Sequence, residues 1–414
     1  MELKINNRES PVLSREFLVL ISLLLFFLYS LSRTLISNVG IGNNFIGYTF
    51  LLLSYFTLLL QILRARTPSL KKAVTFIVSV AILLLFSQLL HPENGNVLTK
   101  GIAPQYGIAI LLFVCSFDNP RSLYDSIILY GFISLISCFV CIIPYIKNGG
   151  YWIVTYAGEK IYTSYNMTLG YNASLAALIF WVVIKKNGKK AFLFIPIICF
   201  VLSLTLGSRG SLMCFLFFAC FSLLSTPMSK RKALSILFFF SMASLLLFIG
   251  MESIIAWVSD TFEQLGLPSR TLSMLADNYS GGEMSSGRSD MWRIIIKKII
   301  EKPFLGYGAF GDRHVLSYYY SNADSLYSHN IILELWASFG IIFGSVFFLW
   351  LIKTLAKTWS VLKGTSLFKP FICLLSYNIA NLLVSNTFWY STAFWFLIGI
   401  CIVALNNPQL ESTK

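Results

Sequence analysis

Long apolar runs separated by short polar segments dominate this chain and predict twelve membrane-spanning helices. The runs approach or exceed the length of about 18 residues that a helix needs to cross a bilayer core. They are expected to be helical because lipid offers no hydrogen-bond partner to an exposed backbone amide. The predicted spans lie near residues 17–36, 45–63, 73–90, 101–117, 124–146, 166–184, 191–206, 210–226, 233–251, 330–352, 367–385 and 389–405. The pattern therefore predicts an all-α, polytopic integral membrane helix bundle.

One long segment, residues 252–328, interrupts the apolar pattern. It carries 9 of the 18 acidic residues of the chain together with 7 basic residues. Within it, apolar side chains recur at helical spacing from Trp292 to Ile299 and predict an amphipathic helix over about residues 286–302. Two placements of this helix remain open: flat on the membrane surface, or packed against the rest of the segment.

Lysine and arginine residues are distributed unevenly between the two sides of the predicted bundle. With the N-terminus in the cytoplasm, the inside segments hold 20 of them and the short external loops hold 5. Such a bias marks the cytoplasmic side of a membrane protein, so both termini are expected there. The expected organisation is residues 1–251 with spans one to nine, a large external loop over 252–328, and residues 329–414 with three spans and a short cytoplasmic tail.

Composition agrees with this class and removes one partner from consideration. The chain is 56% hydrophobic and only 12% charged, about half of the roughly 25% charged residues typical of soluble domains. The net charge of +14 follows from the topology and from contact with anionic inner-leaflet lipid. No basic stripe with interleaved aromatic residues lies outside the predicted spans, so nucleic acid is not an expected partner.

Three short segments that the predicted topology places on the external side carry the candidate chemistry. Arg209 lies in a Gly-Ser-Arg-Gly turn between two spans, Arg288 lies at the start of the amphipathic helix, and His329 opens the tenth span. Two guanidinium groups and one imidazole at a membrane surface favour binding of a lipid-linked phosphate. Each residue alone also fits a structural role: a snorkelling arginine, an ion-pair partner and a helix cap.

Other chemistries find no support in the sequence. No Asp-x-Asp pair, His-Glu-x-x-His, Gly-x-x-x-x-Gly-Lys or Gly-x-Ser-x-Gly motif occurs. His314 and His329 lack neighbouring cysteines or histidines at ligand spacing. We therefore expect a metal-independent reaction without a cofactor.

Four motifs in order resemble the O-antigen ligase and polymerase superfamily of bacterial membrane glycosyltransferases. They are Gly207-Ser208-Arg209-Gly210, Ser286-Gly287-Arg288 followed by Trp292, Pro303-Phe304-Leu305-Gly306-Tyr307-Gly308, and His329-Asn330-Ile331-Ile332-Leu333-Glu334 with Gly340 and Gly344. The resemblance covers about residues 200–350. It implies a bacterial inner-membrane enzyme whose active site faces the periplasm and whose donor is a glycan on undecaprenyl diphosphate.

The resemblance also implies roles for individual residues. Arg209 and Arg288 would bind the diphosphate, and His329 would act as general base in an inverting transfer. Four further residues are expected to contact substrate or to support these three. They are Arg270 as an extra phosphate ligand, Asn330 and Glu334 beside His329, and Tyr307 along the glycan path.

The acceptor remains open between two members of the superfamily. A polymerase of O-antigen or capsule repeat units would use a second lipid-linked repeat unit, with a chain-length regulator as partner. A ligase would transfer the glycan to lipid A-core. The His-Asn-x-x-Leu-Glu form of the histidine motif favours the polymerase. A polysaccharide flippase is an alternative from another class, disfavoured because the distinctive ionisable residues gather at one face instead of crossing the midplane.

Overall fold

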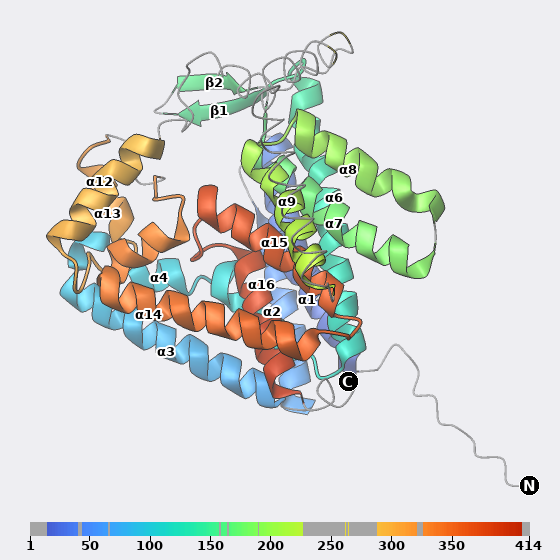
Figure 1. Ribbon diagram of the computed structural model, residues 1–414, viewed down its shortest axis with the longest axis horizontal. Helices are drawn as coiled ribbons and strands as arrows, with labels where there is room; N and C mark the ends of the chain where they lie inside the picture. The colour runs from blue at the N-terminus through green and yellow to red at the C-terminus, as the bar shows by residue number, and fades with distance from the viewer. Residues whose placement is uncertain are drawn as a thin grey trace, which may run out of the picture.

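The computed structural model describes residues 15–39, 44–64, 67–156, 159–163, 165–188, 190–226, 288–320 and 326–407, together with Thr261 and Gln264. These ranges are overwhelmingly helical (Figure 1). Among them, six helices are long and apolar enough to cross a membrane by length and composition. The helical class predicted from the sequence is thereby confirmed for the described ranges, whereas the predicted ninth span, 233–251, lies outside them.

The membrane-length and shorter apolar helices coincide with predicted spans. The long ones are α1 (Arg15–Val39), α2 (Phe45–Arg64), α3 (Pro68–Leu90), α6 (Pro120–Lys147), α7 (Met167–Asn187) and α14 (Ile331–Leu362). The shorter ones are α8 (Phe194–Thr205), which follows a 3-10 turn (Lys190–Leu193), α9 (Arg209–Leu224), α15 (Phe368–Val384) and α16 (Thr392–Asn406). Polar side chains define several of their starts, because Thr67, Asn119, Asn166, Asn330 and Ser391 each accept a hydrogen bond from a first-turn amide.

The predicted span over residues 101–117 is wrong as a continuous helix. The chain here forms α4 (Val97–Gly101), a 3-10 turn (Gly107–Ala109) and α5 (Ile110–Val114), with non-helical residues between them. It still joins opposite ends of the bundle, since Gly101 packs on Leu84 late in α3 and the Asp118 amide donates to Glu16 early in α1.

Burial explains why hydropathy misidentified this crossing. Almost all side chains from Ile108 to Phe117 are buried inside the protein. Irregular backbone is tolerated at membrane depth only where protein or a water-filled cavity surrounds it. Gly107 takes a φ of +62° and lies against the carbonyl of Trp389, a close approach that only glycine permits. The apolar composition therefore reflects a protein core, not a lipid-facing helix.

A short hairpin departs from the all-α prediction. Strands β1 (Trp152–Tyr156) and β2 (Glu159–Thr163) pair antiparallel, with Trp152 opposite Thr163. The Trp152 ring is buried against Tyr145, and its Nε1 donates to the Cys141 carbonyl at 2.8 Å. The sequence offered no periodicity strong enough to assign this stretch.

The core lies around α15 and α16. Nearly every side chain of α16 from Ala393 to Ala404 is buried, and this helix contacts α3, α5, α14 and α15. Around it, α1 packs on α2, α6 packs on α7, and α9 packs on α15. Figure 1 shows α3 and α14 lying side by side along one flank.

The helices alternate in direction and give the bundle two distinct ends. At one end, Lys72 of α3 donates to Asn406 of α16, Lys369 of α15 donates to Ser225 after α9 at 3.0 Å, and Lys186 of α7 lies 4.4 Å above the Tyr124 ring of α6. We call this the basic end. The opposite end, where α3 and α15 finish and α9, α14 and α16 begin, is called the site end.

Two further helices lie at the site end. They are α12 (Arg288–Glu301) and α13 (Gly311–Ser317). The predicted amphipathic helix corresponds to α12, and its face formed by Met291, Ile295 and Ile299 is buried against α13 and α14. The helix thus packs on another part of the predicted loop, α13, and on α14, while Ile296 and Ile300 stay exposed.

A kink in α14 ties this region to the bundle. Gly340 has non-helical φ and ψ of 76° and 169° and abuts the Phe304 carbonyl. The Ile341 amide donates to the Pro303 carbonyl at 2.7 Å, and the Tyr307 amide donates to the Ala337 carbonyl at 2.8 Å. The turn after α12 therefore replaces the hydrogen bonds that the kink removes.

Candidate functional site

The last carbonyl groups of α15 form the centre of the candidate site. The final carbonyls of a helix have no partner within it and need outside donors. Here Asn330 Nδ2 donates to the Leu383 carbonyl at 3.2 Å, Arg288 Nη1 donates to the Val384 carbonyl, and His329 Nδ1 donates to the Ser385 carbonyl at 3.2 Å. Three residues singled out from the sequence thus meet on three consecutive carbonyls.

Arg288 is the first residue of α12 and reaches across to α15. Its guanidinium lies at the negative end of the α15 dipole, which stabilises a cation. It also lies close enough to His329 to influence the titration of the imidazole. Within the described residues α12 begins at Arg288, and the preceding Ser286 and Gly287 of the predicted helix start lie outside them.

His329 has an unusual backbone conformation for a side chain of its size. Its φ of +52° lies in the left-handed region that favours glycine. Its ring packs on the Tyr327 ring with centroids 3.9 Å apart, and Tyr327 Oη donates to the same Ser385 carbonyl at 2.9 Å. Since a carbonyl only accepts, His329 Nδ1 carries the proton. In the neutral imidazole, Nε2 is then the nitrogen with a free lone pair.

The surroundings of His329 keep its imidazole neutral. Burial lowers the pKa of His329 to about 4, and the nearby positive charge of Arg288 contributes to the same shift. The Ser385 carbonyl opposes the shift only partly. At neutral pH the side chain is therefore a proton acceptor at Nε2.

The helix that begins with Arg209 starts beside this centre. Arg209 is the first residue of α9, and the next residue, Gly210, lies against Tyr171 Oη, Ser385 Oγ and Val384. Tyr171 Oη donates to Ser385 Oγ at 2.7 Å. The start of α9 is thus fixed next to the carbonyls that Arg288 and His329 bind.

The glycines of the Gly-Ser-Arg-Gly turn serve close packing of helices. A Cβ on Gly207 would lie 2.9 Å from the Cα of Gly170 in α7, and one on Gly210 would collide with Tyr171. In the structure it is neighbouring protein that approaches them.

Asn330 and Glu334 both occupy structural positions around His329. Asn330 caps α14 by accepting from the amides of Ile332 and Leu333 at 3.0 and 3.2 Å. Glu334 is fully buried and accepts from Thr387 Oγ1, from the Phe388 amide at 3.3 Å and from an arginine, Arg313, at 3.3 Å. Their side-chain bonds are thus to protein groups, and substrate contact by either residue stays a prediction.

The structure brings in charged residues that sequence reasoning missed. Arg313 of α13 bridges Asp312 at 2.9 Å, Glu334 at 3.3 Å and Thr387 at 3.1 Å. Asp312 is as fully buried as Glu334. A signal for this cluster was available, because a carboxylate inside a predicted span requires a paired cation. Which of the external arginines supplies it depends on tertiary structure.

Of the two remaining predicted residues, Tyr307 does not join the centre. Tyr307 lies at the turn below the α14 kink, where the Lys302 ammonium sits 4.6 Å from its ring centroid and Asn94 donates to its carbonyl. Arg270 lies outside the described residues. Within the described ranges, no group of three or more His, Cys, Asp or Glu side chains is placed to hold a metal ion.

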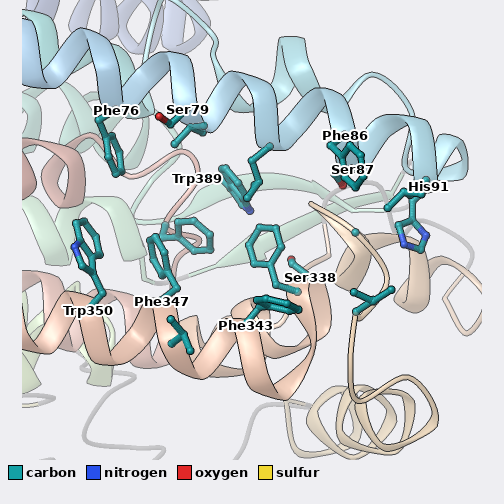
Figure 2. A pocket seen from close by; sticks show the side chains of 18 of the residues that line it. Phe76, Ser79, Phe86, Ser87, His91, Ser338, Phe343, Phe347, Trp350 and Trp389 are labelled. Atoms are coloured by element: carbon teal, nitrogen blue, oxygen red, sulfur yellow. The ribbon is translucent and has the colours of Figure 1, made fainter.

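An apolar groove of about 630 Å³ runs between α3 and α14 and borders the site (Figure 2). Phe76 and Trp350 stack at one end of the groove, with ring centroids 5.9 Å apart, and His91 lies at the opposite end, near α13. Phe388 and Trp389 line its inner wall. These two residues directly follow Thr387, so the groove and the His329 centre share one loop.

The chain is similar in sequence to a known protein family and to two proteins from Rickettsia. The O-antigen ligase family model matches residues 191–351, a range that contains Arg209, Arg288 and His329. A Rickettsia conorii protein that is named a polysaccharide ligase by inference is 31% identical over 142 residues. That match covers 30% of this chain and 33% of the relative.

A second relative extends the similarity over more of the chain. A Rickettsia typhi protein, likewise named a polysaccharide ligase by inference, is 24% identical over 352 residues. The match covers 81% of this chain and 79% of the relative. Both names favour the ligase alternative over the polymerase that the histidine motif suggested.

Proposed function

We propose that this chain, which belongs to the O-antigen ligase superfamily, is a polysaccharide ligase that transfers a glycan from a lipid-linked diphosphate to a separate acceptor. The observation that carries the proposal is the meeting of Arg288 and His329 on consecutive carbonyls of α15, with the start of α9 alongside. An arginine, a neutral imidazole and two helix starts converge there.

The convergence supports binding of a diphosphate. Arg209 and Arg288 are each the first residue of a helix, where free backbone N–H groups and the helix dipole favour an anion. Ser208 Oγ, which precedes α9, has no hydrogen-bond partner among the residues that the structure describes. Arginine suits this role because its planar fork donates two parallel hydrogen bonds to phosphate oxygens.

His329 supplies the proton acceptor for the transfer. Its Nε2 takes the proton from an acceptor hydroxyl while that oxygen attacks the anomeric carbon of the donor sugar. The bond from this carbon to the diphosphate oxygen breaks, and the lipid diphosphate leaves with the electron pair. Arg209 and Arg288 stabilise the charge that develops on it. Direct attack from the opposite face inverts the anomeric configuration.

The groove between α3 and α14 supports a place for the lipid tail of the donor. Its lining is almost wholly apolar, as a hydrocarbon chain requires. Phe388 and Trp389, which line its inner wall, belong to the loop that also carries Thr387. We therefore assign the groove to the polyprenyl tail of the donor, and the family resemblance implies undecaprenyl diphosphate as the carrier.

Charge distribution supports an orientation for the reaction. Lys72, Lys186 and Lys369 all lie at the basic end, and lysine-rich ends face the cytoplasm. The site end then faces the periplasm from the inner membrane. The acceptor there is lipid A-core, which the resemblance to O-antigen ligases implies. The relatives' names favour a ligase over a polymerase.

Surface polysaccharide from a strain lacking this protein tests the proposal. A ligase predicts bare core with finished chains left on the lipid carrier, restored by the wild-type protein and not by His329→Gln. Core that carries a single repeat unit would instead indicate a polymerase. Glycan that accumulates on the cytoplasmic side would indicate a transporter and contradict the enzyme assignment.

A further inference from the structure

A buried ionic cluster beside His329 has no part in the chemistry described above. It joins α13, the first turn of α14 and the loop after α15 through Asp312, Arg313, Glu334 and Thr387. Asp312 and Glu334 have no exposed surface. Burying charges costs several kcal/mol per ion even after relaxation, so packing alone does not account for the cluster.

The polar side chains of the cluster form hydrogen bonds with one another. Arg313 donates to Asp312 Oδ1 at 2.9 Å, to Glu334 Oε1 at 3.3 Å and to Thr387 Oγ1 at 3.1 Å. Thr387 in turn donates to Glu334. The guanidinium carbon also lies 5.3 Å from the Tyr327 ring centroid. The planar guanidinium group of Arg313 donates in fixed directions and so sets the relative positions of all these groups.

From this cluster, bonds lead directly to the segment that carries His329. Asp312 Oδ2 accepts from the Ser328 amide at 2.9 Å, and the Ser328 carbonyl accepts from Trp292 Nε1 at 2.7 Å. Both polar groups of the Ser328 backbone are therefore fixed immediately before His329. Tyr327, against which Arg313 packs, is itself stacked on the imidazole.

The backbone of His329 explains why such restraint is needed. A non-glycine residue in the left-handed region costs on the order of 1–3 kcal/mol and persists only where its surroundings over-determine it. Releasing Ser328 would let His329 relax toward an ordinary φ. The ring would then leave the Ser385 carbonyl that fixes its proton on Nδ1.

We propose that Asp312, Arg313 and Glu334 form a positioning unit that holds His329 in its strained conformation with Nε2 free. Arg313 is its centre, Asp312 clamps the Ser328 amide, and Glu334 anchors the guanidinium to α14. The side-chain hydrogen bonds of all three go to protein groups. The structural part concerns this chain alone, and only the catalytic consequence rests on the proposed function.

The direct test observes the imidazole of His329 by nitrogen NMR. The chain has three histidines, so ¹⁵N-histidine labelling gives few signals, and His329→Gln assigns one of them. The wild type is expected to show a single neutral tautomer protonated at Nδ1. Arg313→Lys keeps the positive charge but lacks the planar guanidinium group with its several donors. Asp312→Asn has one acceptor oxygen, whereas Arg313 and the Ser328 amide each bond to a separate oxygen of Asp312. Both variants are expected to show a mixture of tautomers.

Matched controls separate positioning from general disturbance. Asp290→Asn and Arg293→Lys change exposed residues of α12 in the same way and are expected to leave the His329 signal unchanged. Thr387→Val changes no charge but removes the hydroxyl that accepts from Arg313 and donates to Glu334. It is also expected to give a mixture of tautomers, and it carries the test if the charged variants fail to fold. A His329 signal identical to wild type in every folded variant would overturn the proposal.

Kinetics in proteoliposomes provide the second readout, with an undecaprenyl-diphosphate-linked glycan as donor and lipid A-core as acceptor. A misplaced base lowers turnover by on the order of 100-fold, while the KM for the donor stays unchanged. A loss confined to the donor KM would contradict positioning. A wild type that shows the ordered tautomer but transfers no glycan would refute the proposed function and leave the positioning unit intact.

Discussion

Arg288 and His329 donate hydrogen bonds to consecutive carbonyl oxygens at the end of α15. One shared helix end thus fixes the distance between a cation and a proton acceptor that come from different parts of the chain. The same arrangement puts the positive charge of Arg288 where it discourages protonation of the imidazole. Under the proposed function, this arrangement couples phosphate binding by Arg288 to the basicity of His329.

Replacing His329 by glutamine tests its role as base. Glutamine retains a hydrogen-bonding side chain but cannot take up a proton at neutral pH, so turnover should fall by about 10²–10⁴-fold. Transfer from a lipid-linked glycan donor, followed by gel or mass analysis, measures the change. His314→Gln is the matched control, since His314 in α13 bonds to Tyr318 away from the centre. Equal losses in both variants would remove His329 from the catalytic assignment.

The pH dependence of the reaction should reflect the shifted imidazole. Burial and Arg288 lower the pKa of His329 from 6.5 to about 4, and a general base works only when neutral. The kcat/KM should therefore stay level as pH falls through 6.5 and decline only near 4. A decline centred near 6.5 would show that the imidazole is not shielded in the free enzyme.

Removing the charge of Arg288 should alter both binding and this profile. Arg288→Gln deletes a donor to the departing diphosphate and should reduce turnover by on the order of 10²–10³-fold. It also removes a charge that lowers the pKa of His329, so the acid limb of the residual activity should move to higher pH. Arg293→Gln, on the exposed side of α12, should change neither quantity. An acid limb that stays in place would contradict the coupling of Arg288 and His329.

A bulky side chain in the groove should weaken binding of donors with long lipid tails and spare donors with short ones. Val346 lines the groove on α14, and Val346→Trp should raise the KM of an undecaprenyl donor without affecting a donor with a short prenyl tail. Leu52→Trp on α2 is the control, because Leu52 faces outward and does not line the groove. Equal effects on long-tailed and short-tailed donors would place the tail elsewhere.

The kink in α14 should be intolerant of any side chain. Gly340→Ala adds a Cβ that collides with the Phe304 carbonyl at a φ of +76°, and should lower the melting temperature of the purified protein. Gly364→Ala is the control, since Gly364 also has a positive φ but meets nothing within 4 Å. Its loss in stability should be smaller, and a larger one would contradict the tight junction between α14 and the turn after α12.

Hydrophobic pattern predicted the fold well where helices face lipid. The predicted spans from 17–36 to 389–405 correspond to helices over most of the described chain. The pattern failed at residues 101–117, because burial in protein and exposure to lipid select the same apolar side chains. It also left the β1–β2 hairpin unassigned, since a short two-stranded element carries little periodicity.

The site was predictable to the extent that it depends on topology. Charge bias and motif order pointed to Arg209, Arg288 and His329 on one face, and the structure puts Arg288 and His329 on neighbouring carbonyls at the site end. Arg313 and Asp312 were missed because adjacent opposite charges in a polar loop resemble any solvated pair. Their burial arises only when α13 docks on α14, a contact that sequence spacing does not encode.

Glycan transfer by the reconstituted protein tests the ligase assignment. Purified protein in proteoliposomes would receive an undecaprenyl-diphosphate-linked glycan, with or without lipid A-core. We expect the wild type to attach glycan to lipid A-core and His329→Gln to attach none. Without lipid A-core, we expect no elongation of the lipid-linked glycan. Longer lipid-linked chains without attachment to the core, or attachment that persists in His329→Gln, would contradict these expectations.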